Sequence, residues 1–407
     1  MDSGNLAWSI TATALVLFMT PGVAFFYGGL VRAKSVVSMM MMSFGALGLV
    51  SVLWILYGFN MSVVDGPTQF AGNPFSDFGL GSLATGETGN LDLLGATYGA
   101  TFAIITVALI SGAVADRAKF GSWMIFAGIW ATLVYFPVAA WVWGGGWIMN
   151  LGETLGLPGV IDYAGGTAVH INAGAAALAL ALVLGKRIGF QKGITKPHNV
   201  PLVLLGASIL WFGWFGFNAG AEWLNGLANV GLIVVNTLGA TAAAILGWLI
   251  VEKIRDGKPT SVGAASGAVA GLVAITPACA SLTPGWAILL GIIAGVVCAL
   301  AIDLKFKLGF DDSLDVVGIH LVGGLIGTLY IGLLGTDVGL FLGGGPAQLG
   351  KQAIAAFAVL AYSFVLSFVI GWIIQKTIGF RITTEDEIAG VDTVVHGEEG
   401  YVLTDAK

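Results

Sequence analysis

The chain has 407 residues, of which 57% are hydrophobic and only 10% are charged, and its formal net charge is −6. Soluble domains carry about 25% charged residues, so this composition excludes a soluble fold of this length, which needs a polar surface. The acidic balance also excludes a basic face that binds nucleic acid. A mean hydropathy of +0.91 and 62 glycines indicate a polytopic membrane protein surrounded by a lipid bilayer, because small residues let membrane helices approach closely.

Eleven apolar stretches are each near the ~20 residues that a helix needs to cross a bilayer. They lie at roughly 6–31, 36–60, 92–114, 120–143, 164–185, 200–221, 225–252, 261–277, 284–304, 314–335 and 348–376. The first is preceded by Asp2 and by no basic residue, so we interpret it as a spanning helix and not as a signal peptide. The sequence therefore predicts an all-α polytopic membrane protein with eleven transmembrane helices.

Basic residues alternate between the two ends of these predicted helices. All but one of the 17 Lys and Arg residues follow an odd-numbered helix, and the exception is Lys351. They are Arg32, Lys34, Arg117, Lys119, Lys186, Arg187, Lys192, Lys196, Lys253, Arg255, Lys258, Lys305, Lys307, Lys376, Arg381 and Lys407. Because cytoplasmic loops carry the excess of Lys and Arg, the pattern predicts an N-terminus outside the cell membrane and a cytoplasmic C-terminus.

Helices 1–5 and 6–10 resemble one another. Residues 26–29, Phe-Tyr-Gly-Gly, close the first helix, and residues 217–220, Phe-Asn-Ala-Gly, close the sixth. The fifth and tenth helices each carry an Asp ahead of a histidine, which are Asp162 with His170 and Asp315 with His320. Because each copy has five spans, the second copy is expected to be inverted, and inverted repeats place a substrate path at their interface.

We expect a transmembrane domain over residues 1–378, with repeat one at about 5–186, repeat two at about 199–336 and an outer eleventh helix at about 346–378. The remaining residues, 379–407, are expected to form a cytoplasmic tail that is too short to fold by itself. Cys279 and Cys298 fall in or near apolar segments, which argues against a disulfide framework.

Two of the four histidines, His170 and His320, lie inside apolar helices. Titratable groups at membrane depth are costly and usually face a pathway, although either residue alone can also be a satisfied core side chain. As a repeat-related pair they indicate function, because two neutral imidazoles can share one hydrogen bond and then bind a small polar molecule or relay a proton. A metal site is disfavoured, since no third ligand is evident. His198 and His396 lie in polar segments, and we interpret both as solvated.

Four acids lie close to the two histidine helices. Asp162 and Asp315 are near helix starts, where an Asp caps backbone N–H groups, and a buried Asp162 would also favour a cation in the outer mouth. The pair Asp311 and Asp312 is interpreted as a capping and vestibule feature. Aromatic side chains that can attract a cation through their ring faces are Phe102, Trp143, Trp214 and Phe217.

Taken together, several motifs make the sequence resemble the ammonium transporter family (Amt/Mep/Rh), in its bacterial and archaeal Amt form, over essentially the whole chain. The motifs are at 21–22, 26–30, 143–146, 162–167 with His170, 214–220, 275–279 and 311–320. The resemblance implies a homotrimer with one pore through each subunit. The bacterial type of tail, at 379–381, 390–392 and 396–401, implies docking of a PII-type signalling protein.

The resemblance also implies roles for individual residues. Ammonium recruitment falls to Phe102, Trp143 and Asp162, and the gate to Phe102 stacked on Phe217. The pore residues it implies are His170, His320, Trp214, Tyr27 and Thr276.

One recruitment position departs from the family pattern. Many bacterial members have Ser where this chain has Ala221, and that hydroxyl bonds the recruited ion. A hydrogen bond to a charged group is worth about 1.5–3 kcal/mol. The outer site is therefore expected to be weaker, unless water or Glu222 replaces the hydroxyl.

The resulting hypothesis is a transporter or channel, not an enzyme, that needs no cofactor. It recruits ammonium, removes its proton and conducts ammonia past the histidines, and methylammonium is a further substrate. One alternative is an ammonium sensor that signals through its tail and a PII-type partner. Another is a gas channel of the Rh kind. Hydrolase and phosphate-loop motifs that would indicate a membrane enzyme are not found in the sequence.

Overall fold

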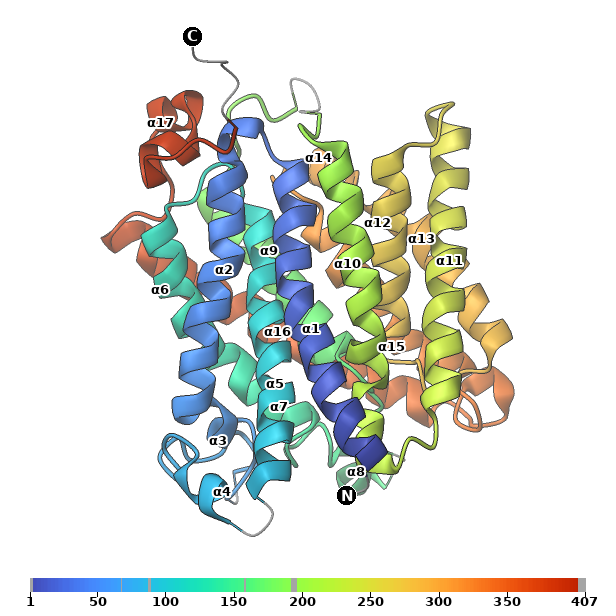
Figure 1. Ribbon diagram of the computed structural model, residues 1–407. Helices are drawn as coiled ribbons and strands as arrows, with labels where there is room; N and C mark the ends of the chain where they lie inside the picture. Colours follow the sequence, from blue (N-terminus) through green and yellow to red (C-terminus); the bar gives the residue numbers. More distant parts are fainter. Residues whose placement is uncertain (1–2, 67, 87–88, 157–158, 192–195, 402–407) are drawn as a thin grey trace.

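The computed structural model describes residues 3–66, 68–86, 89–156, 159–191 and 196–401 (Figure 1). Lys192 and Lys407, two of the basic residues used to predict the topology, lie outside these ranges. Within them, ten helical segments are long and apolar enough to cross a membrane, and an eleventh, Ser261–Ile275, is shorter. The described chain is helical apart from loops and one isolated bridge between Ala118 and Arg381, so the prediction of an all-α membrane protein with eleven helices is confirmed.

The first repeat contains nine α-helices. Two of its membrane spans, Ala33–Met61 and Phe120–Val142, each contain two of these helices. The nine helices are α1 (Ser3–Leu30), α2 (Val36–Leu53), α3 (Phe59–Met61), α4 (Gly81–Thr85), α5 (Gly89–Ile110), α6 (Phe120–Trp130), α7 (Phe136–Val142), α8 (Leu151–Leu155) and α9 (Asn172–Leu184). The remaining helices are α10 (Val200–Ala219), α11 (Val230–Arg255), α12 (Ser261–Ile275), α13 (Pro284–Ala301), α14 (Leu304–Leu308), α15 (Val322–Leu334), α16 (Ala347–Thr377) and α17 (Thr384–Ala389).

Short π-helical and 3-10 turns join or extend these helices. The π-helical turns are η2 (Trp54–Gly58), η4 (Ala131–Tyr135), η5 (Gly166–Ile171), η7 (Val317–Leu321) and η9 (Asp392–His396). The 3-10 turns are η1 (Ala33–Ser35), η3 (Ser111–Val114), η6 (Gly220–Asn225) and η8 (Leu340–Leu342). Single π-helical turns within helices are frequent at functional sites, and η5 and η7 contain the two buried histidines.

The start of the seventh span differs from its prediction. The apolar run suggested a start near residue 225, but α11 begins at Val230. The chain first completes the 3-10 turn η6 and then passes through Gly226 and Leu227, both with positive φ. The left-handed backbone there interrupts the helix, although the local composition stays apolar.

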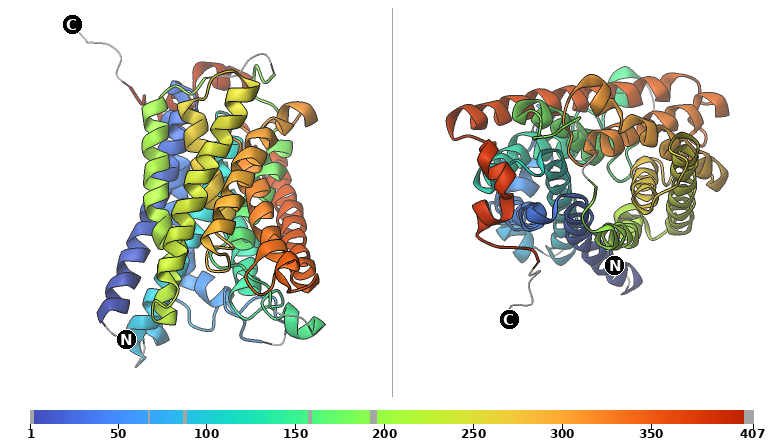
Figure 2. Two further views of the ribbon diagram at one scale, coloured as in Figure 1. Left: turned by 90° about the vertical axis from the view of Figure 1, so that its right-hand side faces the viewer. Right: turned by 90° about the horizontal axis from the view of Figure 1, so that it is seen from above.

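Most of the long helices run side by side along one axis, whereas α16 crosses one edge of the bundle obliquely (Figure 2). It packs against α9, α15 and α6, as expected for an outer eleventh helix. The two repeats meet most extensively at α1 and α10. The backbones there are very close, because a Cβ added to Gly206 of α10 would lie 2.2 Å from Phe26 N of α1.

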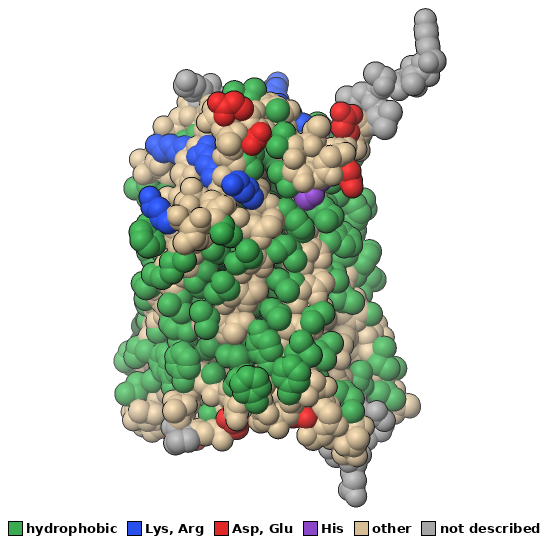
Figure 3. All heavy atoms as spheres, turned by 90° about the vertical axis from the view of Figure 1, so that its left-hand side faces the viewer, with side chains coloured by type: hydrophobic (Ala, Val, Ile, Leu, Met, Phe, Trp, Pro, Cys, Tyr) green, Lys and Arg blue, Asp and Glu red, His purple; other side chains and the backbone are tan. Residues whose placement is uncertain are grey.

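The surface is divided along the bundle axis (Figure 3). A broad apolar band covers its middle, and Lys and Arg side chains gather at the end where the tail lies. The exposed apolar side chains on the spans include Phe44, Ile55, Phe212, Leu246 and Val365, each more than half exposed or nearly so. An apolar belt of this kind is what a lipid bilayer requires of a helical membrane protein.

The structure changes the pairing of the acids in the two repeats. Asp162 lies eight residues before His170, and Asp312, not Asp315, lies eight residues before His320. Asp315 instead matches Gly165, and both have positive φ, +63° and +117°. The predicted pairing of Asp162 with Asp315, and the capping role of Asp315, are therefore wrong.

Candidate functional site

A cavity of about 310 Å³ opens at the end of the bundle that carries the N-terminus of α1. Its wall contains three of the four predicted recruitment residues: Phe102 of α5, Trp143 after α7 and Ala221 of η6. No charged side chain lines it among the described residues. The aromatic rings give the cavity faces that attract a cation.

The fourth predicted recruitment residue, Asp162, lies behind this wall and does not line the cavity. Its backbone carbonyl accepts a hydrogen bond from Trp143 Nε1 at 2.9 Å. Its carboxylate accepts four backbone N–H groups at 2.6–3.0 Å, from the consecutive residues 165–168. Burial raises the pKa of the Asp162 carboxyl although these four bonds oppose the shift. Asp162 thus anchors both the start of η5 and the indole of Trp143.

Two stacked phenyl rings close the inner end of this cavity. The ring centroids of Phe102 and Phe217 are 4.2 Å apart, with an interplanar angle of 24°. Both side chains are buried. Phe217 lines the outer cavity on one side and the next cavity along the path on the other. The two predicted gate residues are therefore in contact, and one of them, Phe217, lies between the two spaces.

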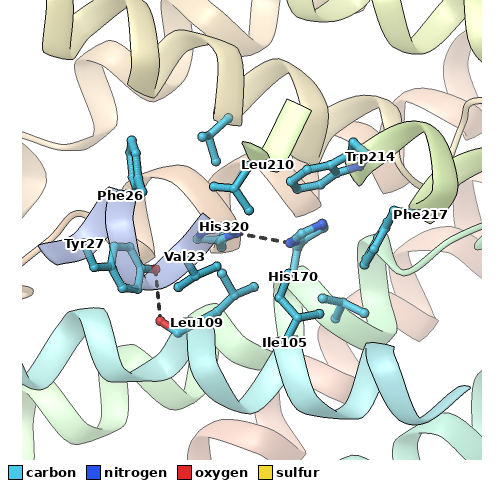
Figure 4. Close-up of a pocket in the computed structure, with 12 residues that line it drawn as sticks. Val23, Phe26, Tyr27, Ile105, Leu109, His170, Leu210, Trp214, Phe217 and His320 are labelled. Carbon is cyan, nitrogen blue, oxygen red and sulfur yellow. Dashed lines mark hydrogen bonds between the residues drawn. The ribbon is translucent and has the colours of Figure 1, made fainter. Parts of the chain in front are cut away.

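Beyond Phe217 the path narrows to a cavity of about 10 Å³, the space of roughly one water molecule. Its lining is apolar except for His170, His320 and two aromatic side chains that carry a polar atom, Tyr27 and Trp214. The two imidazoles point toward each other, and their Nδ1 atoms are 3.1 Å apart (Figure 4). One ring donates and the other accepts, an arrangement that two neutral imidazoles can make. His170 Nε2 is buried and has no hydrogen-bond partner in the part of the chain that the structure describes.

The histidines are held by the close crossing of their two helices. Gly174 and Gly324 each follow a histidine by four residues. A Cβ on Gly174 would lie 2.5 Å from Leu321 N, and a Cβ on Gly324 would lie 3.1 Å from His170 Cβ. A side chain at Gly174 would therefore force the two helices apart, and one at Gly324 would be tight against His170.

The remaining predicted pore residues divide into two groups. Trp214 lies stacked on His170, with ring centroids 5.5 Å apart and an interplanar angle of 16°, and Tyr27 lies at the other end of the lumen. The Tyr27 hydroxyl donates to Leu109 O at 3.1 Å. Thr276 does not line the lumen. Its hydroxyl accepts a hydrogen bond from Trp214 Nε1 at 2.8 Å, so it positions the indole instead.

A third cavity, of about 220 Å³, lies at the end of the bundle near the tail. Charged side chains on its wall include Arg32, Asp116, Arg187, Lys305 and Asp315. They form ion pairs: Arg187 with Asp116 at 2.9 Å, and Lys305 with Asp315 at 2.6 Å. The positive and negative charges therefore largely offset one another across this wall.

Arg187 also joins the cavity wall to the interior. Its guanidinium contacts both oxygens of the fully buried Asp311, at 2.9 and 3.0 Å. Although burial opposes ionisation, the hydrogen bonds and charge of Arg187 hold the pKa of the Asp311 carboxyl below its ordinary value. Asp312, the partner of Asp162 in the repeat, accepts from Val317 N at 2.7 Å. The two residues interpreted as a capping and vestibule pair thus have different roles. Asp311 forms an ion pair with Arg187, and Asp312 caps the start of η7.

Sequence reasoning missed two sets of residues. It interpreted Arg187 only as a topology signal, because the pairing with Asp311 joins residues 124 apart in sequence. It also interpreted His198 as solvated, which is wrong: the ring is half-buried and contacts Val31 O and the Tyr401 hydroxyl at 2.7 and 2.9 Å. His396 is likewise half-buried, with its ring against Phe120.

Metal binding receives no geometric support among the described residues, where no cluster of three His, Cys, Asp or Glu side chains is suited to a metal ion. Both cysteines are free and buried. A narrow apolar lumen next to a wider cavity, inside a bundle of apolar helices that can cross a membrane, indicates a membrane transport protein.

Comparisons with known proteins identify the kind of transport protein. A model of the Ammonium Transporter Family matches residues 7–401. The chain is 53% identical to the ammonium transporter of Mycobacterium tuberculosis, over 98% of this chain and 90% of that protein. The crystal structure of Candida albicans Mep2 matches with a TM-score of 0.84 and 32% identity, over 99% of this chain and 94% of that one. A solved structure named Sensor Amt Protein matches with a TM-score of 0.87 and 29% identity, over 96% and 98%.

The chain therefore belongs to the ammonium transporter family, as the motifs in the sequence predicted. It is a multi-pass membrane protein of a family of transporters and channels, not of enzymes.

Proposed function

We propose that this protein recruits ammonium in the outer cavity, removes its proton and conducts ammonia past His170 and His320 into the inner cavity. The observation that carries the proposal is the 3.1 Å contact between the two imidazoles. It lies in a lumen of about 10 Å³, and larger cavities of about 310 and 220 Å³ lie toward the two ends of the bundle. In this proposal Phe102, Trp143, Asp162 and Ala221 form the recruitment site.

The chemistry of the lumen favours a neutral substrate. Moving an isolated ion into an apolar medium costs far more than moving a small hydrogen-bonded molecule, and the lumen offers no carboxylate among its lining residues. Loss of one proton makes ammonium neutral, and the resulting ammonia can both donate to and accept from an imidazole. Potassium has no proton to lose, so this path excludes it.

The Phe102–Phe217 pair supports the order of these steps. The stacked rings separate the wide outer cavity from the lumen, so a cation bound against Trp143 and Phe102 is held before it reaches the histidines. Cation–π attraction of about 0.5–2 kcal/mol per ring favours binding there. We infer that the rings open as a gate for the deprotonated molecule.

We infer that the outer cavity faces the outside of the cell membrane and that the tail faces the cytoplasm. The support is the gathering of Lys and Arg side chains at the tail end of the bundle (Figure 3), which the positive-inside rule assigns to the cytoplasm. The transmembrane domain then comprises residues 1–378, and residues 379–407 form a regulatory tail.

We further infer a homotrimer with one path in each subunit, methylammonium as a second substrate and a PII-type partner at the cytoplasmic face. The family resemblance carries these inferences. The packing of the tail supports the last of them. Asp392 accepts from Val37 N and Ser38 N at 3.0 and 2.7 Å, and Tyr401 contacts His198 and Asn199. A partner that binds the tail would thus be connected, through these contacts, to the cytoplasmic ends of α1, α2 and α10.

The same observation favours an ammonium sensor as the second candidate function. A tail bonded to the ends of α2 and α10 can report a change inside the bundle, and the solved structure named Sensor Amt Protein has the same fold. A gas channel of the Rh kind remains an alternative from the sequence, and the aromatic outer cavity favours a cation over carbon dioxide.

The test is uptake of radiolabelled methylammonium into proteoliposomes by the wild type, His320→Ala and Trp143→Leu. We expect His320→Ala to lose most of its uptake, because the lumen loses a hydrogen-bonding group. Trp143→Leu is expected to need a higher substrate concentration, because the cavity loses a ring face. Tyr362→Phe, which alters an exposed hydroxyl bonded to Leu133 O, is the control. Normal uptake by both site variants would contradict the proposal.

A further inference from the structure

The Tyr163 hydroxyl of the outer cavity differs in its hydrogen-bond partner from the hydroxyls of Ser62 and Tyr98. Ser62 and Tyr98 line the cavity and give their protons to backbone carbonyls, those of Phe59 and Gly216. The indole N–H of Trp143 is likewise bonded to a carbonyl. Tyr163 also lines the cavity, but its hydroxyl donates to the carboxylate of Glu222.

Glu222 is a buried carboxylate with an unusual set of partners. It is 0% exposed and is the residue after Ala221 on the 3-10 turn η6. It accepts hydrogen bonds from Asn229 N at 2.7 Å, from Asn225 Nδ2 at 3.5 Å and from Tyr163. None of the ion pairs in the described part of the chain includes it. A buried charge without an opposite charge is costly, so a cation nearby would stabilise it.

The geometry determines what the Tyr163 oxygen can offer. A hydroxyl has one proton and two lone pairs. Because its proton is held by Glu222, the Tyr163 oxygen has only lone pairs left for a further partner, and donation to a carboxylate strengthens it as an acceptor. Ala221 offers only a methyl group on the same wall. The hydroxyls of Ser62, Tyr98 and Tyr163 have thus given their protons to protein groups, and each can only accept a further hydrogen bond.

We propose that Tyr163 accepts an N–H hydrogen bond from the recruited cation and that Glu222, behind it, is the positioning residue that polarises the phenol. This proposal rests on the proposed recruitment of ammonium in the outer cavity. It names the acceptor that acts where Ala221 has no hydroxyl. The ligand class is a small ammonium with at least one N–H group, held between the ring faces of Phe102 and Trp143 and the phenol oxygen.

Burial beside Glu222 keeps the Tyr163 phenol protonated, which is the form that the proposal requires. Desolvation, followed by the bond to Glu222, raises the pKa of Tyr163 well above its ordinary value. The hydroxyl therefore stays protonated, and its proton stays on the side of the carboxylate.

The test compares Tyr163→Phe, Glu222→Gln and the double variant in full-length protein reconstituted in liposomes, with methylammonium uptake as the measurement. Tyr163→Phe removes a single oxygen, and we expect about a tenfold rise in KM with little change in maximal rate, equivalent to about 1.4 kcal/mol. Glu222→Gln is expected to raise KM less, because its amide oxygen still holds the phenol but without charge. The double variant is expected to be no worse than Tyr163→Phe, because the carboxylate acts through the phenol.

A rescue experiment separates this role from a merely structural one. Ala221→Ser places a hydroxyl on the same cavity wall, so in the Tyr163→Phe background it is expected to restore much of the lost affinity. A KM that stays at the wild-type value in Tyr163→Phe would overturn the proposal. So would a rise in KM that Ala221→Ser leaves unchanged. Because Tyr163→Phe keeps the ring, the test stands even if Glu222→Gln lowers the yield of folded protein.

The Trp143→Leu variant distinguishes failure of this proposal from failure of the proposed function. A raised KM in Trp143→Leu together with a normal KM in Tyr163→Phe leaves the recruitment site in place and removes only the acceptor role. A normal KM in both variants removes the recruitment site itself, and the acceptor role with it.

Discussion

The outer and inner cavities lie toward opposite ends of the bundle and are lined by different kinds of side chain. The outer cavity, of about 310 Å³, is lined by aromatic rings and uncharged groups. The inner cavity, of about 220 Å³, is lined by Arg, Lys and Asp side chains that are bonded to one another. Aromatic faces are free to bind a cation, whereas paired charges are already satisfied. The side chains that line the outer cavity are therefore expected to determine substrate affinity. Those that line the inner cavity are expected to stabilise the fold.

Replacing Arg187 by Ala is expected to have the largest effect on stability. It leaves the carboxylate of Asp311 without its guanidinium partner and leaves Asp116 with only Arg32, 3.6 Å away. Removing one member of a buried pair costs about 3–5 kcal/mol. The measurement is the thermal unfolding of the purified protein in detergent. Lys186→Ala is the matched control, because the neighbouring Lys186 is exposed and surface substitutions change stability by less than about 0.5 kcal/mol. Equal unfolding temperatures for the two variants would remove the structural role of the inner ion pairs.

Asp162 and Asp312, which precede the two helices that carry the histidines, are expected to differ in how much they contribute to stability. Asp162→Asn sets an amide N–H₂ against two of the four backbone N–H groups now bonded to the carboxylate. Each unsatisfied buried donor costs about 1–3 kcal/mol, so we expect the two to cost about 2–6 kcal/mol. Asp312→Asn keeps an oxygen for Val317 N, so we expect a loss below about 1 kcal/mol. Thermal unfolding and methylammonium uptake measure both, and a larger loss in Asp312→Asn would contradict the comparison.

The stability of the inner end is expected to depend on pH through Asp312. Burial raises the pKa of Asp312 to about 6, with Lys305 opposing and Asp315 adding to the shift. The folded state thus binds this proton more tightly than the unfolded chain, in which the pKa is about 3.9. The contribution to stability is present below about pH 4 and is lost as the pH rises through 6.

We therefore expect the free energy of unfolding of the wild type to fall by on the order of 1–3 kcal/mol between about pH 4 and pH 7 because of this group. Each unit of difference between the folded and unfolded pKa values is worth about 1.4 kcal/mol. Asp312→Asn, which does not titrate, is the control. Parallel pH profiles of unfolding temperature for the two proteins would show that Asp312 contributes nothing.

Removing the tail contact at Asp392 is expected to have the smallest effect. The Asp392 carboxylate caps the N-terminus of α2 through Val37 N and Ser38 N, and loss of a capping side chain costs about 1 kcal/mol. Asp392→Ala should speed proteolytic cleavage of the tail about fivefold, which corresponds to that energy. Glu398→Ala, also in the tail and exposed, should leave the cleavage rate unchanged. A tail as resistant as that of the wild type would show that this cap does not hold it in place.

Features of single helices could be predicted from the sequence. The eleven spans follow from apolar length, since a bilayer requires about 20 apolar residues for each helix, and all eleven are present. His170 and His320 could be found because titratable residues are rare in apolar helices. Their 3.1 Å contact could not be measured from the sequence, but the repeat placed the two residues at corresponding positions.

Features that join distant segments could not be predicted. The bonds between Arg187 and Asp311, and between Tyr163 and Glu222, span 124 and 59 residues, and nothing local marks either pair. The sequence also offers three acids before His320, and only the backbone shows that Asp312 is the cap while Asp315 takes the left-handed position of Gly165. Thr276 was expected in the pore because its motif is near the path, yet it positions Trp214 from behind.

The central claim is that the substrate gives up its proton before it enters the lumen. It is tested most directly by measuring methylammonium uptake and potassium flux in the same proteoliposomes. Since potassium has the charge of ammonium and no proton to lose, we predict methylammonium uptake without any potassium flux. Potassium flux comparable to methylammonium uptake would contradict the account, because it would mean that intact cations pass His170 and His320.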